Sequence, residues 1–479
     1  MTTPEQSAPR RITGIENEWS IVYDDPLNKR YVPISRAQII LLIEKHLPEY
    51  LTRSDDLGMM SNGARLYRDS LDFLETASAE EVSLQAAVAG DIASERIVAA
   101  MVHSAIQAGH LPSSSRVNKR VVGDRAPDAT GGIHTWGYHV SFAADSKKLR
   151  TTDDRMSPLA AHLASMDIYA GAGILRPYDP NHAYVIGQKK LNLSCNFSTA
   201  SHGTSQPLIS DRNEAHAADE HLRIHVTSMD PHISPWATWM SLGTSSIVTR
   251  LMENGYTAEE FMKDSETDPY VIAREVARDP SLKNEYSLRG GKRMSAIDMQ
   301  DRLYKQAESI QLSDEERAVM KEWKRALDTL KRNPLELTDA DWVMRYNLIR
   351  NKTEKADVGL GSNIARYWND EYDLVYEYPK TTEQGVAKRS LVNYLRARSF
   401  SSHLPPEELI SDRMESAPSD TRAAARAELI KQYIGRKGLR VDWSKVTYED
   451  EDDDGTLHEF KLGNPYTLKV DYTKYQRAK

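Results

Sequence analysis

The sequence of 479 residues contains a single cysteine, Cys195, and no long apolar run. A lone cysteine excludes an internal disulfide and any cysteine-rich metal site. No stretch approaches the ~18 consecutive apolar residues that a membrane-spanning helix requires. Residues 1–10 are polar and lack the apolar centre of a signal peptide, so we expect a disordered lead there. These absences favour a cytoplasmic protein without membrane contact.

The sequence also lacks an excess of positive charge and the common nucleotide motifs. Its formal net charge is −8, whereas broad nucleic-acid binding usually needs a basic surface, so we expect no nucleic-acid partner. It contains no G-x-x-x-x-G-K-[ST] phosphate loop, no G-x-G-x-x-G turn after a strand, no G-x-S-x-G elbow and no H-E-x-x-H helix. A nucleotide site in this chain would therefore use carboxylate-held Mg²⁺ on a sheet.

Two charged, strand-like stretches near the N-terminus are the most informative feature that is present. The first covers residues 11–22, and the second covers residues 62–69 and begins with an Asn-Gly turn signal. Successive side chains of a strand point to opposite faces. In the first stretch Glu16 and Glu18 therefore share a face. In the second stretch the side chains that share a face are those of Arg65, Tyr67 and Asp69.

Neighbouring carboxylates with an arginine and a tyrosine suit a Mg-nucleotide site. Two carboxylates on one strand face repel each other unless a cation or a basic group lies between them. Carboxylate oxygens are the hard ligands that Mg²⁺ prefers, and a guanidinium group binds phosphate through paired hydrogen bonds. Glu75 and Glu80 add two carboxylates downstream. The alternative interpretation is a solvated sheet face with ordinary surface charges. Two such stretches together favour this alternative less than one stretch alone would.

The rest of the sequence predicts an α+β protein. Residues 135–143 alternate as a strand does, with His139 and Ser141 on one face. The tail from 440 to 479 predicts short strands around an acidic turn at 449–455, which we interpret as a solvated loop. Apolar residues recur at helical spacing in four segments, which we expect to be helices: 83–108, 236–252, 299–309 and 313–332.

Short motifs spread along the chain resemble the Pup ligase and Pup deamidase-depupylase family, which is related to glutamine synthetase and other carboxylate–amine ligases. Residues 14–19 (GIENEW) resemble the opening motif of that family, and residues 62–69 (NGARLYRD) resemble its second motif. The motifs keep the order and approximate spacing of the family over almost the whole chain. The others lie at 171–173, 188–189, 212–217, 222–226, 341–343, 373–376 and 417–423.

The resemblance implies a set of site residues. Glu16, Tyr67 and Glu75 match positions that bind Mg²⁺ in the family, and Glu18 beside them is a further ligand candidate. Asp69 matches the catalytic aspartate, which helps to deprotonate the incoming lysine in the ligase and acts as nucleophile or activates water in the depupylase. Positions that match nucleotide, phosphate or metal-proximal contacts are Arg65, Ser78, His139, Arg212 and Arg223.

The resemblance also implies a fold, cofactors and partners. The fold is α+β, with a glutamine synthetase-like large domain at 11–400, a curved and mostly antiparallel sheet, and a small C-terminal domain at 401–479. The cofactors are ATP, or ADP with phosphate, and Mg²⁺. The partners are Pup and pupylated proteins, and we expect a monomer. The reaction concerns the isopeptide bond between the C-terminal glutamate side chain of Pup and a substrate lysine.

Departures from the family pattern bear on the direction of this reaction. The family's His-Glu-Asn triplet is His139-Val140-Ser141 here, its Gln-Arg pair ends in Lys189, and Leu404 stands where the family has a nucleotide-stacking tryptophan. A lysine cannot reproduce the paired phosphate contact of an arginine. Because a ligase must bind and split ATP in each cycle, weakened nucleotide contacts lead us to expect nucleotide-dependent hydrolysis, as in a depupylase.

The length of one interval favours the opposite direction. The depupylase usually carries a long extra loop between the first two motifs, and the interval from Trp19 to Asn62 is too short to hold it. An ATP-dependent Pup–protein ligase is therefore the alternative. A weakly catalytic regulatory paralogue and a ligase for small molecules with an amine and a carboxylate stay open as further alternatives.

Overall fold

The computed structural model describes most of the chain in segments. The described residues are 10–25, 30–54, 58–69, 73–119, 137–149, 156–176, 179, 181–198, 206–210, 220–258, 268–377, 391–398, 403–449, 456–466, 468 and 470–476. The predicted lead at residues 1–10 lies outside them except for Arg10, and so do Arg212 and residues 450–455 of the predicted acidic turn. None of the helices in the described segments is long and apolar enough to span a membrane.

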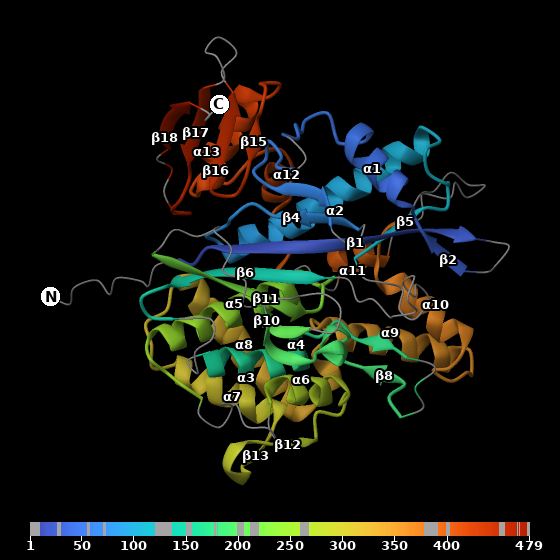
Figure 1. The fold of residues 1–479 in the computed structure, drawn as a ribbon. Helices are drawn as coiled ribbons and strands as arrows, with labels where there is room; N and C mark the ends of the chain where they lie inside the picture. The colour runs from blue at the N-terminus through green and yellow to red at the C-terminus, as the bar shows by residue number, and fades with distance from the viewer. Residues whose placement is uncertain are drawn as a thin grey trace.

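A ten-stranded sheet runs through the centre of the molecule (Figure 1). Its main path is β14-β5-β1-β6-β11-β10-β9; β2 and β4 also pair with β1, and β3 pairs with β4. Among its described pairs only β9 and β10 run parallel, so the predicted mostly antiparallel sheet is confirmed. The strands are β1 (Thr13–Asp25), β2 (Arg30–Pro33), β3 (Arg65–Arg68), β4 (Leu74–Ala77), β5 (Arg116–Asn118), β6 (Tyr138–Asp145), β9 (Cys195–Ser198), β10 (Pro207–Ser210), β11 (His221–Met229) and β14 (Leu374–Glu377).

Strand β1 divides its side chains between two environments. Ile15, Trp19 and Ile21 are buried in apolar clusters, and the Trp19 indole donates a hydrogen bond to Thr76 Oγ1 at 2.9 Å. Because side chains alternate along a strand, this burial turns Glu16 and Glu18 to the other face of the sheet. A shift of one residue in register would turn both carboxylates into the apolar clusters, so the apolar positions determine the register.

The predicted helices are confirmed with small changes at their ends. Segments 83–108, 236–252, 299–309 and 313–332 correspond to α2 (Leu84–Gln107), α5 (Pro235–Glu253), α7 (Ala296–Ala307) and α8 (Asp314–Arg332). The α7 helix begins three residues before the expected start because Ser295 and Asp298 form a capping box. Further helices are α1 (Arg36–Lys45), α3 (Ser157–Ser165), α4 (Asp167–Ala170), α6 (Pro269–Ala277), α9 (Asp341–Lys355), α10 (Asn363–Tyr372), α11 (Leu391–Arg398) and α12 (Glu407–Glu415).

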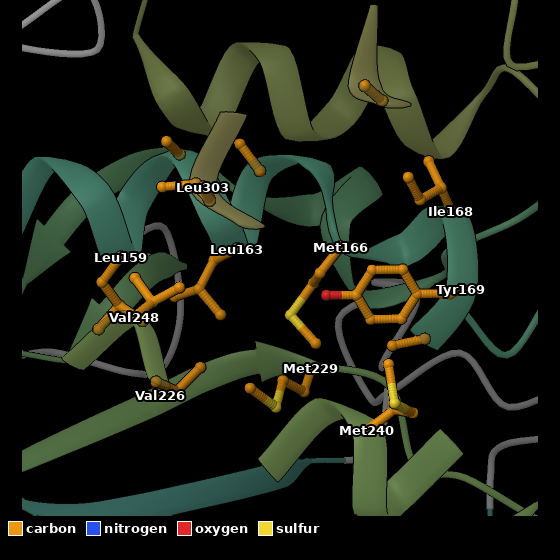
Figure 2. Packing of buried hydrophobic residues seen from close by; sticks show 14 of the residues in the cluster. Leu159, Leu163, Met166, Ile168, Tyr169, Val226, Met229, Met240, Val248 and Leu303 are labelled. Carbon is orange, nitrogen blue, oxygen red and sulfur yellow. The ribbon is translucent and has the colours of Figure 1, made fainter. Parts of the chain in front are cut away.

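The largest apolar core lies between the sheet and the helices that gather below it in Figure 1. Figure 2 shows Leu163 and Met166, from α3 and its C-terminal end, pointing toward Met229 of β11. Val226 and Val248 complete this contact between β11 and α5. Full burial of such a side chain stabilises the fold by about 1.5–3 kcal/mol. This core therefore fixes the position of the central strands, whose opposite face carries Glu16 and Glu18.

A small C-terminal module, made of α13 (Arg422–Tyr433) and a four-stranded antiparallel sheet, lies above the large sheet in Figure 1. It has an apolar cluster of its own, whereas α12 packs on α2 of the large domain through Ile410. The predicted division into a large domain at 11–400 and a small domain at 401–479 stays a prediction. Its strands are β15 (Arg440–Val441), β16 (Lys445–Glu449), β17 (Thr456–Lys461) and β18 (Asp471–Gln476).

Buried ion pairs attach the C-terminal module to the large sheet. The Glu80 carboxylate accepts from Arg422 Nε at 2.7 Å and from Arg426 Nη2 at 2.5 Å. The Tyr466 hydroxyl accepts from the backbone N–H of Ile12, at the start of β1, at 3.0 Å. All of these contacts lie near one end of β1. They therefore place one side of the module over that end of the sheet face that carries Glu16 and Glu18.

Candidate active site

The first row of site residues crosses the sheet at Glu16. This residue lies opposite His139 of β6 and Ala77 of β4, and Ala77 lies opposite Arg65 of β3. Directly opposed residues of antiparallel strands project to the same face. The structure therefore brings His139, Glu16 and Arg65 together on one face, and Ala77 leaves space between two of them.

The second row crosses the sheet at Glu18. Glu18 lies opposite Glu75, and Glu75 lies opposite Tyr67. Asp69 follows β3 at a turn, where its Oδ1 accepts the backbone N–H of Phe73 at 2.7 Å. One carboxylate oxygen from each of Glu18, Asp69 and Glu75 lies within 4.8 Å of the others. The predicted carboxylates thus form one cluster, and their roles as ligands or base stay predictions.

Burial and neighbouring carboxylates together determine the electrostatics of the second row. Burial, followed by the charges of Glu16 and Glu18, raises the pKa of Glu75 well above its usual range. Burial, followed by the charges of Glu75 and Glu16, raises the pKa of Tyr67 well above its usual value, so its phenol is neutral. The Arg65 guanidinium lies 4.0 Å from the centre of the Tyr67 ring. A divalent cation among these oxygens would relieve the repulsion.

Positive and imidazole groups surround Glu16. Arg223 Nη2 lies 2.9 Å from Glu16 Oε1, while His139 Nδ1 and His225 Nε2 lie 3.2 and 3.4 Å from Oε2. Burial alone would raise the pKa of Glu16, but the charge of His225, the hydrogen bond of His139 and the charge of Arg223 hold it well below the usual range. Burial and Arg223 lower the pKa of His225 to about 4, although Glu16 acts in the opposite direction.

His225 was missing from the predicted set. It follows Arg223 by two residues in the LRIHV motif, so both side chains lie on one face of β11. The spacing of two residues could have indicated His225, because a strand face that presents Arg223 also presents the residue two positions further along.

An open cleft with a cavity volume of about 80 Å³ continues from Glu16 toward the C-terminal module. Gly14 and Ser141 lie opposite each other on its sheet side. No heavy atom lies within 4 Å of the position that a Cβ would take at Gly14, beyond its chain neighbours. The module contributes Arg422, Trp443 and Pro465 to the lining.

Ser78 also lines the cleft, at the place where a nucleotide contact is predicted. Its hydroxyl accepts the backbone N–H of Ile15 at 3.0 Å and donates to the carbonyl of Ala79 at 3.1 Å. These bonds hold the segment after β4 against β1. The predicted contact between Ser78 and a nucleotide stays a prediction.

Two expectations about lost nucleotide contacts are wrong. Val140 is fully buried in the main core, on the strand face opposite His139, so it removes no acid from the site face. Leu404 packs beside Val88 on α2, away from the cleft. An indole lines the cleft nevertheless, because Trp443 supplies it from the C-terminal module.

Lys189 keeps a cation near the carboxylates. Its backbone N–H donates to Asp230 Oδ1 at 2.8 Å, which anchors the turn that carries it. Burial lowers the pKa of Lys189, while the nearby charges of Glu18 and Asp230 act to raise it. Lysine in place of the family's arginine therefore loses the ability to form two parallel hydrogen bonds to a phosphate, but it keeps a positive charge close to Glu18.

Comparison with known proteins gives a consistent result. The family model described as Pup-ligase protein matches residues 11–447. The Pup--protein ligase of Acidimicrobium ferrooxidans is 27% identical over 450 residues, which cover 92% of this chain and 93% of that protein. The Pup--protein ligase of Mycobacterium tuberculosis strain H37Rv is 25% identical over 458 residues and covers 92% of this chain and 94% of its own length.

Two solved structures share the fold. The complex between Pup and its ligase PafA aligns with a TM-score of 0.78 and 21% identity, covering 98% of this chain and 92% of that one. PafA in complex with ADP aligns with a TM-score of 0.68 and 20% identity, covering 90% and 89%. At 21% and 20% identity, these two structures show only that the chain shares their fold. Since the family model spans most of the sequence, the chain belongs to the Pup-ligase protein family.

Proposed function

We propose that the protein is an ATP- and Mg²⁺-dependent ligase that joins the C-terminal glutamate side chain of Pup to lysines of target proteins. The observation that carries the proposal is the cleft, which joins an indole and an arginine at one end to the carboxylate face at the other. Relatives that align over 92% of the chain are named Pup--protein ligase. Together these support the ligase over the hydrolase that the departures had favoured.

The oxygen donors of the site fit Mg²⁺. Glu18 and Glu75 provide carboxylates, Tyr67 a phenol and Glu16 a further carboxylate at the border of the two rows. Burial first, and then the charges of Glu16 and Glu18, raise the pKa of Glu75, and a cation bound among these oxygens would favour its ionised form. When bound, Mg²⁺ neutralises charge on the nucleotide phosphates.

Nucleotide binding would use both ends of the cleft. Trp443 offers a flat surface for the base, and Gly14 leaves the sheet side open where any larger residue would project into it. Arg223 and Arg65 flank Glu16 on the sheet, so the phosphates would extend toward them. Arginines in this place stabilise charge that develops on the transferred phosphoryl group.

The reaction then needs two steps. In the first, a carboxylate oxygen of the Pup glutamate attacks the γ-phosphorus of ATP, the bond to the bridging oxygen breaks, and ADP leaves with the electron pair. In the second, the lysine amine attacks the acyl phosphate carbon and inorganic phosphate leaves. Asp69, held by its bond to Phe73, takes the proton that the amine loses.

A conjugation assay tests the direction. The purified protein is incubated with Pup, a target protein and Mg²⁺, with ATP or with a non-hydrolysable analogue, and conjugates are followed by gel shift. We expect conjugates with ATP alone and none with the analogue. A second reaction starts from a purified Pup conjugate. Release of Pup that is faster than conjugation, and that persists with the analogue, would replace the ligase by the depupylase.

A further inference from the structure

A buried carboxylate at the end of β11 holds two separate turns of the chain. Asp230 directly follows the last residue of β11 and is only 2% exposed. Its Oδ2 accepts the backbone N–H groups of Ala172 at 3.1 Å and Gln188 at 3.0 Å, and its Oδ1 accepts that of Lys189 at 2.8 Å. One carboxylate thus connects two of the short sequence motifs, at 171–173 and 188–189.

The two turns also pack backbone against backbone. The Gly173 N–H donates to the carbonyl of Ile186 at 2.8 Å. A Cβ at Gly171 would lie 2.2 Å from the same carbonyl oxygen, so only glycine allows the two backbones to approach this closely. The position of the turn at 187–189 therefore depends on this contact and on the bonds to Asp230.

Lys189 depends on Asp230 for the start of its own helix. It begins the short 3-10 helix η2 (Lys189–Asn192), and the first N–H groups of a helix have no partner within it. The side chain of Gln188 forms no capping bond, and Asp230 accepts the N–H groups of Gln188 and Lys189 instead. The Lys189 ammonium lies close enough to Glu18 for their charges to interact.

We propose that Asp230 is a positioning residue for nucleotide binding: through the turn at 187–189 it places the ammonium of Lys189, which binds a phosphate group. This role rests on the proposed function, because that function puts a Mg-nucleotide on the carboxylate face. An ammonium beside these carboxylates meets the same phosphate charge that a bound cation neutralises. Since Asp230 holds the backbone of Lys189, less conformational freedom is lost when the flexible side chain binds phosphate.

Asp230→Asn tests this role with little change of shape. A carboxylate presents two acceptor oxygens, whereas an amide presents one oxygen and one NH₂ group that only donates. The amide oxygen keeps the most bonds at the place of Oδ2, where it accepts from Ala172 and Gln188. The NH₂ group then faces the N–H of Lys189, which loses its acceptor. The substitution therefore releases the bond that places Lys189.

A double-mutant cycle shows whether the two residues act together. Binding of ATP with Mg²⁺ is measured by calorimetry for the wild type, Asp230→Asn, Lys189→Met and the double variant. We expect each single variant to weaken ATP binding by about 10-fold, as the loss of one hydrogen bond to a charged group does. The double variant should also lose about 10-fold, because displacing residue 189 has no further effect once its ammonium is gone. Multiplied losses of about 100-fold, or wild-type affinity in Asp230→Asn, would overturn the proposal.

Asp279→Asn is the matched control. Asp279 is also buried, and its carboxylate accepts the backbone N–H groups of Ser281 at 3.1 Å and Asn284 at 2.9 Å. Among the described residues that line the cleft, none comes from this turn. The control should lower the thermal stability, as Asp230→Asn does, and leave the ATP affinity unchanged.

If circular dichroism shows that Asp230→Asn does not fold, Asp230→Glu takes its place in the cycle. It keeps both carboxylate oxygens and displaces the turn by one methylene group, so the same lack of additivity with Lys189→Met is expected. Because the readout is ATP affinity, a wild type that binds ATP without forming conjugates would contradict the ligase and leave the cycle valid. A wild type that binds no ATP would overturn the role of Asp230 as well.

Discussion

Removing the charge of Glu80 should loosen the C-terminal module from the large sheet. Arg422 and Arg426, both buried, bind the Glu80 carboxylate. Burial alone would raise the pKa of Glu80, but the two arginines lower it from 4.5 to about 2. A difference of about 2.5 pKa units corresponds to about 3 kcal/mol. Loss of one partner of a buried ion pair typically costs about 3–5 kcal/mol, which agrees.

Glu80→Gln keeps the shape of the side chain and removes its charge, so it leaves two buried guanidinium groups without their anion. Hydrogen–deuterium exchange of α13 and β15–β17 reports the opening of the module. We expect these amides to exchange at least about 100-fold faster than in the wild type, in proportion to the lost free energy. The matched control is Glu285→Gln, because Glu285 and its partner Arg293 are more than half exposed and such pairs contribute about 0–1 kcal/mol.

The ion pairs of Glu80 with Arg422 and Arg426 also give the stability a defined pH dependence. The folded-state pKa of Glu80 is depressed, so its stabilisation is complete above pH 4.5 and is lost as the pH falls toward about 2. Urea unfolding curves of the wild type and of Glu80→Gln should therefore differ most near neutral pH and converge near pH 2. Equal stabilities at neutral pH, or a gap that stays constant between pH 5 and pH 2, would refute the reasoning.

Three further predictions concern the site. Asp69→Asn should slow conjugation by ~100-fold or more while ATP affinity measured by calorimetry is unchanged; full activity would assign the proton transfer to another residue. Trp443→Ala should weaken ATP binding by about 10-fold, since stacking on an aromatic ring contributes ~1–3 kcal/mol, whereas Leu404→Ala should have no effect on that affinity; the reverse order would restore the sequence-based expectation. Gly14→Val should abolish ATP binding with an unchanged circular dichroism spectrum, and retained binding would show that the nucleotide lies elsewhere.

The carboxylate face was predictable because it depends on local periodicity. Any sheet that buries Ile15 and Trp19 turns Glu16 and Glu18 to its other face. The same rule places Tyr67 beside Arg65 on β3. The helices α2, α5, α7 and α8 were also predictable, since their apolar residues recur with the helical period and none of these signals requires knowledge of distant contacts.

The inference that the family departures remove nucleotide contacts is wrong at Val140 and Leu404, for a physical reason. A substitution affects a site only if its side chain reaches the site, and a motif comparison cannot tell which way a side chain points in space. Val140 points into the core, and Leu404 packs beside α2. Trp443 reaches the cleft because the buried pairs of Glu80 place the module over the end of β1.

The sequence by itself determined which residues share a strand face, which segments form helices and which family the motifs resemble. Only the tertiary structure decided which faces meet. Arg223 and His225 reach Glu16 because β11 pairs with β6, and β6 pairs with β1, across a separation of 207 residues between Arg223 and Glu16. Period-two alternation is a property of a few consecutive residues, whereas strand order and register follow from packing of the whole core.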